Sequence, residues 1–127
     1  MPDQKIILLV EDEPVLSNLL RQRLEKDGFK VMVAKDGEEA LKVLKTAKPD
    51  LILLDVILPK LSGFELMEKL REEPEFQKAP IIIISNLGQE SDMEKGQMLG
   101  AAEYLVKAKL SIEELVEKVK AFLSPKA

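Results

Sequence analysis

Three short stretches of this sequence are apolar from end to end, and they constrain the fold more than any other feature. They are Ile6–Val10, Leu51–Leu54, which runs directly into Asp55, and Ile81–Ile84. A strand with one exposed face alternates apolar and polar residues, so a strand without alternation is buried on both faces. Such strands are typical of parallel sheets that helices cover on both sides. We therefore expect a parallel sheet at the centre of the fold.

Two further runs, Val31–Ala34 and Ala102–Val106, bring the expected strands to five, and a helical pattern follows each strand. The helices are expected to begin at Pro14, after Asp36-Gly37, after Gly63, at Ser91 and at Ser111. The last two starts have the form Ser-x-x-Glu, a capping box in which each side chain accepts a hydrogen bond from the backbone. Five strand–helix units predict a (βα)5 doubly wound α/β sheet in a three-layer sandwich, formed by a single domain over residues 1–127.

Absent residue types exclude several kinds of chemistry. The chain contains no His and no Cys, so a Ser-His-Asp triad, a zinc site with His or Cys ligands, and a disulfide are ruled out. Its net charge of −4 argues against a nucleic-acid surface, which requires clustered Lys and Arg. No apolar run approaches the roughly 20 residues that span a bilayer, and the first residues do not resemble a signal peptide. We expect a cytoplasmic protein without membrane contact.

Polar side chains follow four of the five expected strands. Glu11 and Asp12 come after the first strand, Asp55 ends the third, Ser85 follows the fourth and Lys107 follows the fifth. Ligands of open α/β sheets bind at the carboxyl ends of the strands, where the strand order reverses. If the order is 2-1-3-4-5, the first and third strands are neighbours at that point. The three carboxylates would then lie together, with Ser85 and Lys107 beside them.

Three carboxylates in one cleft repel one another, and a divalent cation would relieve this repulsion. A ligand set made only of oxygen atoms favours Mg²⁺. Asp55 could then act as an oxygen nucleophile toward phosphorus, because carboxylates are known to form aspartyl phosphates. Ser85 and Lys107 would bind the phosphoryl oxygens.

Taken together, these residues resemble the receiver domain of two-component response regulators, a family with the CheY-like variant of the flavodoxin-like fold. The resemblance covers essentially the whole chain. The matching residues are Glu11-Asp12, Asp55 with Pro59 and Gly63 behind it, Ser85, Tyr104 and Lys107.

The resemblance implies a role for each residue at the phosphorylation site. Asp55 would accept a phosphoryl group from a sensor histidine kinase or a phosphotransfer protein. Asp12, Asp55 and the backbone carbonyl of Ile57 would bind Mg²⁺ directly, and Glu11 would act through a metal-bound water. Lys107 would contact the phosphoryl group and Asp55. The domain would not be an enzyme beyond catalysing its own phosphoryl transfer and dephosphorylation.

The resemblance also implies a switch that changes partner binding. Ser85 would move toward the phosphoryl group, and Tyr104 would swing inward to fill the vacated space. The face made by the fourth helix, the fifth strand and the fifth helix would then change its preference for an output partner or a fused effector domain. Phosphorylation could also favour a homodimer. This domain itself would not contact nucleic acid.

Two positions depart from the family pattern and leave a second function open. Ala108 stands where the family usually has a cis proline, so the loop is either trans, with Lys107 shifted, or strained. Asn86 follows Ser85 at a position where the family usually has a smaller residue, and it would narrow access to the phosphoryl group. Both departures would suit a binding module that keeps the fold but never turns over phosphate.

The same residues also permit simpler roles. Glu11 and Asp12 could cap a helix, and Tyr104 could be an ordinary core residue. A small phosphatase or nucleotide-binding enzyme is disfavoured, because neither GxxxxGK nor GxGxxG follows the first strand.

Overall fold

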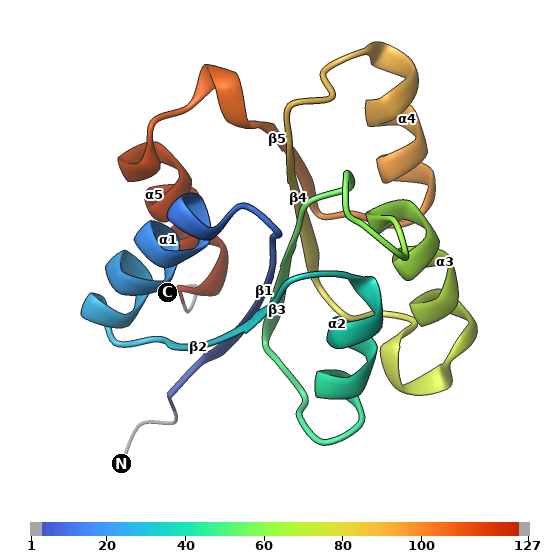
Figure 1. Ribbon diagram of the computed structural model, residues 1–127, viewed down its shortest axis with the longest axis horizontal. Helices are drawn as coiled ribbons and strands as arrows, with labels where there is room; N and C mark the ends of the chain where they lie inside the picture. Colours follow the sequence, from blue (N-terminus) through green and yellow to red (C-terminus); the bar gives the residue numbers. More distant parts are fainter. Residues whose placement is uncertain (1–3, 125–127) are drawn as a thin grey trace.

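A computed structural model describes residues 4–124 and contains a five-stranded sheet at its centre (Figure 1). All neighbouring strands are parallel, and their order is β2-β1-β3-β4-β5, as predicted. The strands are β1 (Ile6–Val10), β2 (Lys30–Ala34), β3 (Leu51–Leu54), β4 (Ile81–Ser85) and β5 (Glu103–Val106). The two ends of the predicted domain, residues 1–3 and 125–127, lie outside the described residues.

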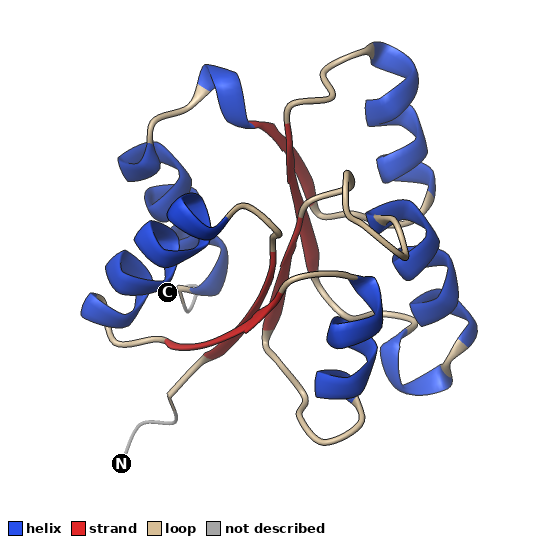
Figure 2. Ribbon diagram, in the orientation of Figure 1, coloured by secondary structure: helices blue, strands red, loops and turns tan. Residues whose placement is uncertain are grey.

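Helices cover both faces of the sheet and complete the predicted three-layer sandwich (Figures 1 and 2). Helices α1 and α5 lie on one face, and α2, α3 and α4 lie on the other. The helices are α1 (Pro14–Lys26), α2 (Gly37–Leu44), α3 (Gly63–Glu72), α4 (Glu90–Met98) and α5 (Ile112–Leu123), with short 3₁₀ helices η1 (Pro74–Phe76) and η2 (Lys107–Lys109). Within residues 4–124, no helix combines the length and apolarity that crossing a membrane requires.

The core explains why the central strands lack alternation. Leu8 and Val10 of β1 pack into the layer beneath α2 and α3, whereas Ile7 and Leu9 pack into the layer beneath α1 and α5. All four side chains are fully buried. Successive residues of a strand point to opposite faces, so a strand between two helical layers is apolar at every position.

Helix starts agree with the sequence prediction at α5 and differ at α4. Ser111 and Glu114 form the predicted capping box, with hydrogen bonds of 3.1 and 2.9 Å. The prediction that Ser91 and Glu94 open α4 is wrong. The helix begins at Glu90, and the N–H of its cap residue Gln89 donates to Asp92 at 3.3 Å. Asp92 provides an acceptor two residues before Glu94, so the helix starts earlier.

Arg71, near the end of α3, joins three segments at the edge of the sheet where β4 and β5 begin. Its guanidinium group donates to the backbone carbonyls of Phe76 at 2.8 Å, Ala79 at 3.1 Å, Leu99 at 2.9 Å and Gly100 at 3.1 Å. Burial lowers the pKa of Arg71. All four acceptors belong to the main chain, and two of them lie at the carboxyl end of α4, where a cation is electrostatically favoured.

Candidate functional site

The carboxyl ends of β1 and β3 bring three acidic residues together. Val10, the last residue of β1, pairs with Leu54, the last residue of β3. Glu11 directly follows Val10, and Asp55 directly follows Leu54. Carboxylate oxygens of Glu11, Asp12 and Asp55 all lie within 4.8 Å of one another. Glu11 and Asp55 are 1% and 5% exposed, while Asp12 is open to solvent. The structure therefore contains the acidic cluster that the sequence predicted.

Lys107, which follows β5, bridges the two buried carboxylates. Its ammonium group lies 2.5 Å from Oε1 of Glu11 and 2.7 Å from Oδ2 of Asp55. The remaining oxygens accept main-chain hydrogen bonds, Oε2 of Glu11 from Glu13 at 3.1 Å and Oδ1 of Asp55 from Ile57 at 3.0 Å. Each of the four buried oxygens therefore has a donor, which offsets much of the cost of burying charge.

Burial and ion pairing shift two pKa values in this cluster. Burial raises the pKa of Glu11, and the Lys107 ammonium beside it opposes the shift without cancelling it. Burial by itself would lower the pKa of Lys107, but hydrogen bonds from its ammonium to Asp55 and Glu11 outweigh that effect and raise the pKa. Lys107 therefore stays charged at neutral pH.

The bond between Lys107 and Ala108 is trans, because the described residues contain no cis peptide. Of the two conformations left open for this loop, the structure has the trans form. The side chain still reaches Asp55, since residues 107–109 form the 3₁₀ turn η2 directly after β5.

Ser85 and Tyr104 lie beside the acidic cluster and meet at Leu87. Ser85 ends β4 fully buried, and its hydroxyl accepts a hydrogen bond from the Leu87 amide at 3.1 Å. The Tyr104 hydroxyl donates to the Leu87 carbonyl at 2.6 Å. A Cβ atom on Gly96 would lie 3.0 Å from the Tyr104 ring, so the ring packs directly beneath α4. Among the described residues, Ser85 has no hydrogen bond to Asp55 or Lys107.

The loop after Asp55 requires a glycine at position 63. The Gly63 amide donates to the Val56 carbonyl at 3.0 Å, and a Cβ atom there would lie only 2.5 Å from the carbonyl oxygen of Asp55. Lys60 in the same loop has a positive φ of 66°. This close packing fixes the backbone that carries Asp55 and the Ile57 amide.

Sequence reasoning missed the main-chain donors of the site, the amides of Glu13 and Ile57. Every residue except proline has an amide, so the sequence carries no signal for the ones that point at a carboxylate. Asn86 is exposed, and the Ile57 side chain is 55% exposed.

Comparisons with known proteins agree with this geometry. A profile of the family described as "Response regulator receiver domain" matches residues 7–120. The chain is 45% identical over 117 residues to the phosphate regulon transcriptional regulatory protein PhoB of Rhizobium meliloti, covering 92% of the chain and 51% of PhoB. It is 44% identical over 119 residues to the alkaline phosphatase synthesis transcriptional regulatory protein PhoP of Bacillus subtilis, covering 94% and 48%.

A solved structure has the same fold. Chemotaxis protein CheY4 of Vibrio cholerae superposes with a TM-score of 0.87 at 27% identity, over 95% of this chain and 100% of that one. The chain spans about half the length of the curated relatives it matches.

Proposed function

This chain belongs to the family of response regulator receiver domains of two-component systems, and on that premise we propose that phosphorylation of Asp55 operates it as a signalling switch. The observation that carries the proposal is the environment of Asp55. This buried carboxylate follows a central strand and accepts hydrogen bonds from Lys107 and the Ile57 amide. It is an oriented oxygen nucleophile beside a cation that can bind phosphoryl oxygens.

The acidic cluster supports Mg²⁺ as the metal of the site. The donors are oxygen atoms only, and one carboxylate, that of Asp12, is open to solvent. We assign direct binding to Asp12, Asp55 and the Ile57 carbonyl, with Glu11 acting through a water molecule. The ion would neutralise charge on the phosphoryl oxygens.

The phosphoryl donor in this proposal is a phosphohistidine of a sensor kinase or a phosphotransfer protein. An Asp55 oxygen forms a bond to phosphorus while the phosphorus–nitrogen bond breaks, and the electron pair of that bond stays on the imidazole. Lys107 then contacts the phosphoryl group, as the position of its ammonium beside Asp55 supports. Later hydrolysis of the acyl phosphate returns the domain to its resting state.

The output step is assigned to Ser85 and Tyr104. Both residues hydrogen-bond to the backbone of Leu87. A shift of the Ser85 hydroxyl toward a phosphoryl group would therefore displace Leu87, and with it Tyr104 and the part of α4 that packs on its ring. We propose that the α4-β5-α5 face then changes its affinity for an output partner, a fused effector domain or a second copy. In this proposal residues 1–127 act as one receiver domain in the cytoplasm.

The test is Mg²⁺-dependent phosphorylation by acetyl phosphate, read as the mass of one added phosphoryl group. We expect uptake by the wild-type chain, no uptake after chelation of the metal, and no uptake by Asp55→Asn. The matched control is Asp27→Asn, which removes an aspartate from the end of α1 and should leave uptake unchanged. Wild-type protein that stays folded with Mg²⁺ and takes up no phosphate would contradict the proposal and favour a binding module.

A further inference from the structure

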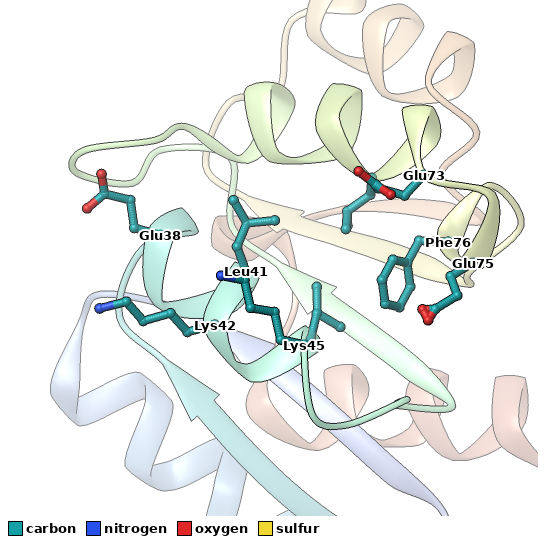
Figure 3. Close-up of a pocket in the computed structure, with 9 residues that line it drawn as sticks. Glu38, Leu41, Lys42, Lys45, Glu73, Glu75 and Phe76 are labelled. Carbon is teal, nitrogen blue, oxygen red and sulfur yellow. The ribbon is translucent and has the colours of Figure 1, made fainter.

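A groove of about 760 Å³ lies on the described surface between α2 and η1 (Figure 3). Its floor is apolar and consists of Leu41 and Leu44 from α2, Leu70 from α3 and Phe76 from η1. Leu44 and Leu70 are buried, whereas Leu41 and Phe76 are partly exposed. The groove belongs to a different part of the surface from the acidic cluster, with which it shares no residue.

The two walls of the groove carry opposite charges. Lys42 and Lys45 line the α2 side, and Glu73 and Glu75 line the side of α3 and η1 (Figure 3). All four side chains are exposed, and none forms an ion pair with another residue of the described chain. Glu38 adds one acidic group at the amino end of α2. An apolar floor between unpaired charges of opposite sign is the reverse image of an amphipathic helix with mixed flanks.

The hollow also continues past Phe76. A second hollow of about 400 Å³ shares Glu75 and Phe76 with the groove and extends to Lys48 and Lys78. The two hollows therefore adjoin at Phe76. A second copy would present the same concave surface, and two facing hollows would leave their floors unfilled.

From this surface we infer that the α2–η1 groove docks an amphipathic helix of a partner protein. That helix carries an apolar stripe for the floor, acidic residues on the flank that faces Lys42 and Lys45, and basic residues on the flank that faces Glu73 and Glu75. Phe76, an aromatic residue at the junction of the two hollows, is the central contact, since aromatic side chains dominate the energy of such interfaces. The inference does not depend on phosphorylation of Asp55.

Three synthetic helical peptides test the inference with the unphosphorylated chain. They share a leucine stripe at i, i+4, i+7 and i+11 and differ only in their flanks, which are one acidic and one basic, both acidic, or both basic. We expect the mixed peptide to bind with a Kd below about 1 mM and about tenfold more tightly than either other peptide, the combined effect of several exposed charge pairs. A free peptide can bind in whichever direction places its acidic flank against the lysines, so the preference does not depend on the direction of a natural partner helix. Amide NMR shifts on binding should centre on residues 41–45 and 73–77.

Charge-reversal variants locate the effect. Lys42→Glu with Lys45→Glu makes both walls acidic, so the tightest ligand should become the peptide with two basic flanks. The matched control is Lys26→Glu with Lys30→Glu, which makes the same change in net charge at exposed positions outside the groove. This control should keep the preference for the mixed peptide. The variant residues are exposed, so folding should be retained, as circular dichroism can verify.

Several results would overturn the inference. They are the failure of all three peptides to bind, equal binding of the three, and a preference that Lys42→Glu with Lys45→Glu leaves unchanged. Concentration-dependent association of the chain alone that this double variant abolishes would also overturn it, because the occupant would then be a second copy. None of these results bears on phosphate uptake by Asp55.

Discussion

At the scale of single residues, Lys107 makes the acidic site compatible with a folded core. Its ammonium lies within 2.7 Å of both Glu11 and Asp55, two carboxylates that are almost completely buried. Without a cation, two buried carboxylates at this separation would repel each other and favour protonation. Glu11 still has a raised pKa, mainly because of its burial. One lysine therefore compensates the pair only in part.

The raised pKa of Glu11 predicts a specific dependence of stability on pH in metal-free protein. The folded state binds the Glu11 proton more tightly than the unfolded state, whose pKa is near 4.5. The stabilisation is therefore fully present below pH 4.5 and is lost as pH rises through the folded pKa. We expect Glu11→Gln to remove this loss, so that the free energy of unfolding in urea with EDTA falls less between acidic and neutral pH.

Glu39→Gln is the control for this experiment, because the Glu39 carboxylate accepts a bond from the Lys35 amide and has no hydrogen bond to Glu11, Asp55 or Lys107. It should keep the wild-type slope above pH 4.5. A Glu11→Gln protein with an unchanged slope would mean that Glu11 ionises in the folded state as it does in water. Lys107 does not interfere, since its raised pKa acts above pH 10.5.

The side chains of the site could be predicted because each follows a strand whose position was clear from its apolar run. Glu11, Asp55 and Lys107 converge as expected, once β1, β3 and β5 are placed in order. The trans form at Ala108 with Lys107 still in contact could not be predicted, because it depends on how the η2 turn folds. Nor could the contact of the Tyr104 ring with Gly96, which requires the packing of α4.

At the scale of elements, helix starts separate what local sequence decides from what it does not. Ser111-x-x-Glu114 forms a capping box, and Ser62-x-x-Glu65 forms another that was not predicted. Ser91-x-x-Glu94 has the same pattern and forms none, because α4 already begins at Glu90. The pattern marks a favourable start, and at α4 the pair Gln89 and Asp92 provides an earlier one.

This difference predicts the effect of removing each serine hydroxyl. Ser62→Ala and Ser111→Ala should each lower the free energy of unfolding by about 1 kcal/mol, since each leaves a helix amide without its acceptor. Ser91→Ala should change it by less than about 0.5 kcal/mol, because Ser91 is exposed within the first turn. Chemical denaturation of the three variants measures this directly. A cost at Ser91 equal to the other two would mean that α4 starts at that residue.

At the scale of the whole molecule, the acidic cluster exists only when the sheet is assembled. Its carboxylates follow β1 and β3, and Lys107 follows β5 at the other side of β4. The unfolded chain has no such site, so a cation that binds there stabilises the fold as a whole. The stability of the entire domain therefore reports on metal binding.

We expect Mg²⁺ to raise the free energy of unfolding by about 2.7 kcal/mol at a concentration one hundred times its Kd. Asp12→Asn should lose most of this gain with little change in metal-free stability, because Asp12 is exposed. Thermal unfolding with increasing Mg²⁺ measures both quantities. Equal gains in wild type and Asp12→Asn would mean that the ion binds elsewhere. The control is Asp50→Asn, at the opposite end of the strands, which should keep the gain from Mg²⁺.

The hydrogen bonds from Arg71 to four backbone carbonyls have a consequence for how this protein can evolve. A carbonyl oxygen is present whatever side chain its residue carries, so mutations at a position such as Ala79 leave the acceptor in place. The side chains on this part of the surface can therefore change, and with them any binding specificity, while the hydrogen bonds of Arg71 are kept. What must stay unchanged is Arg71 itself and the backbone conformation that presents the four carbonyls to it.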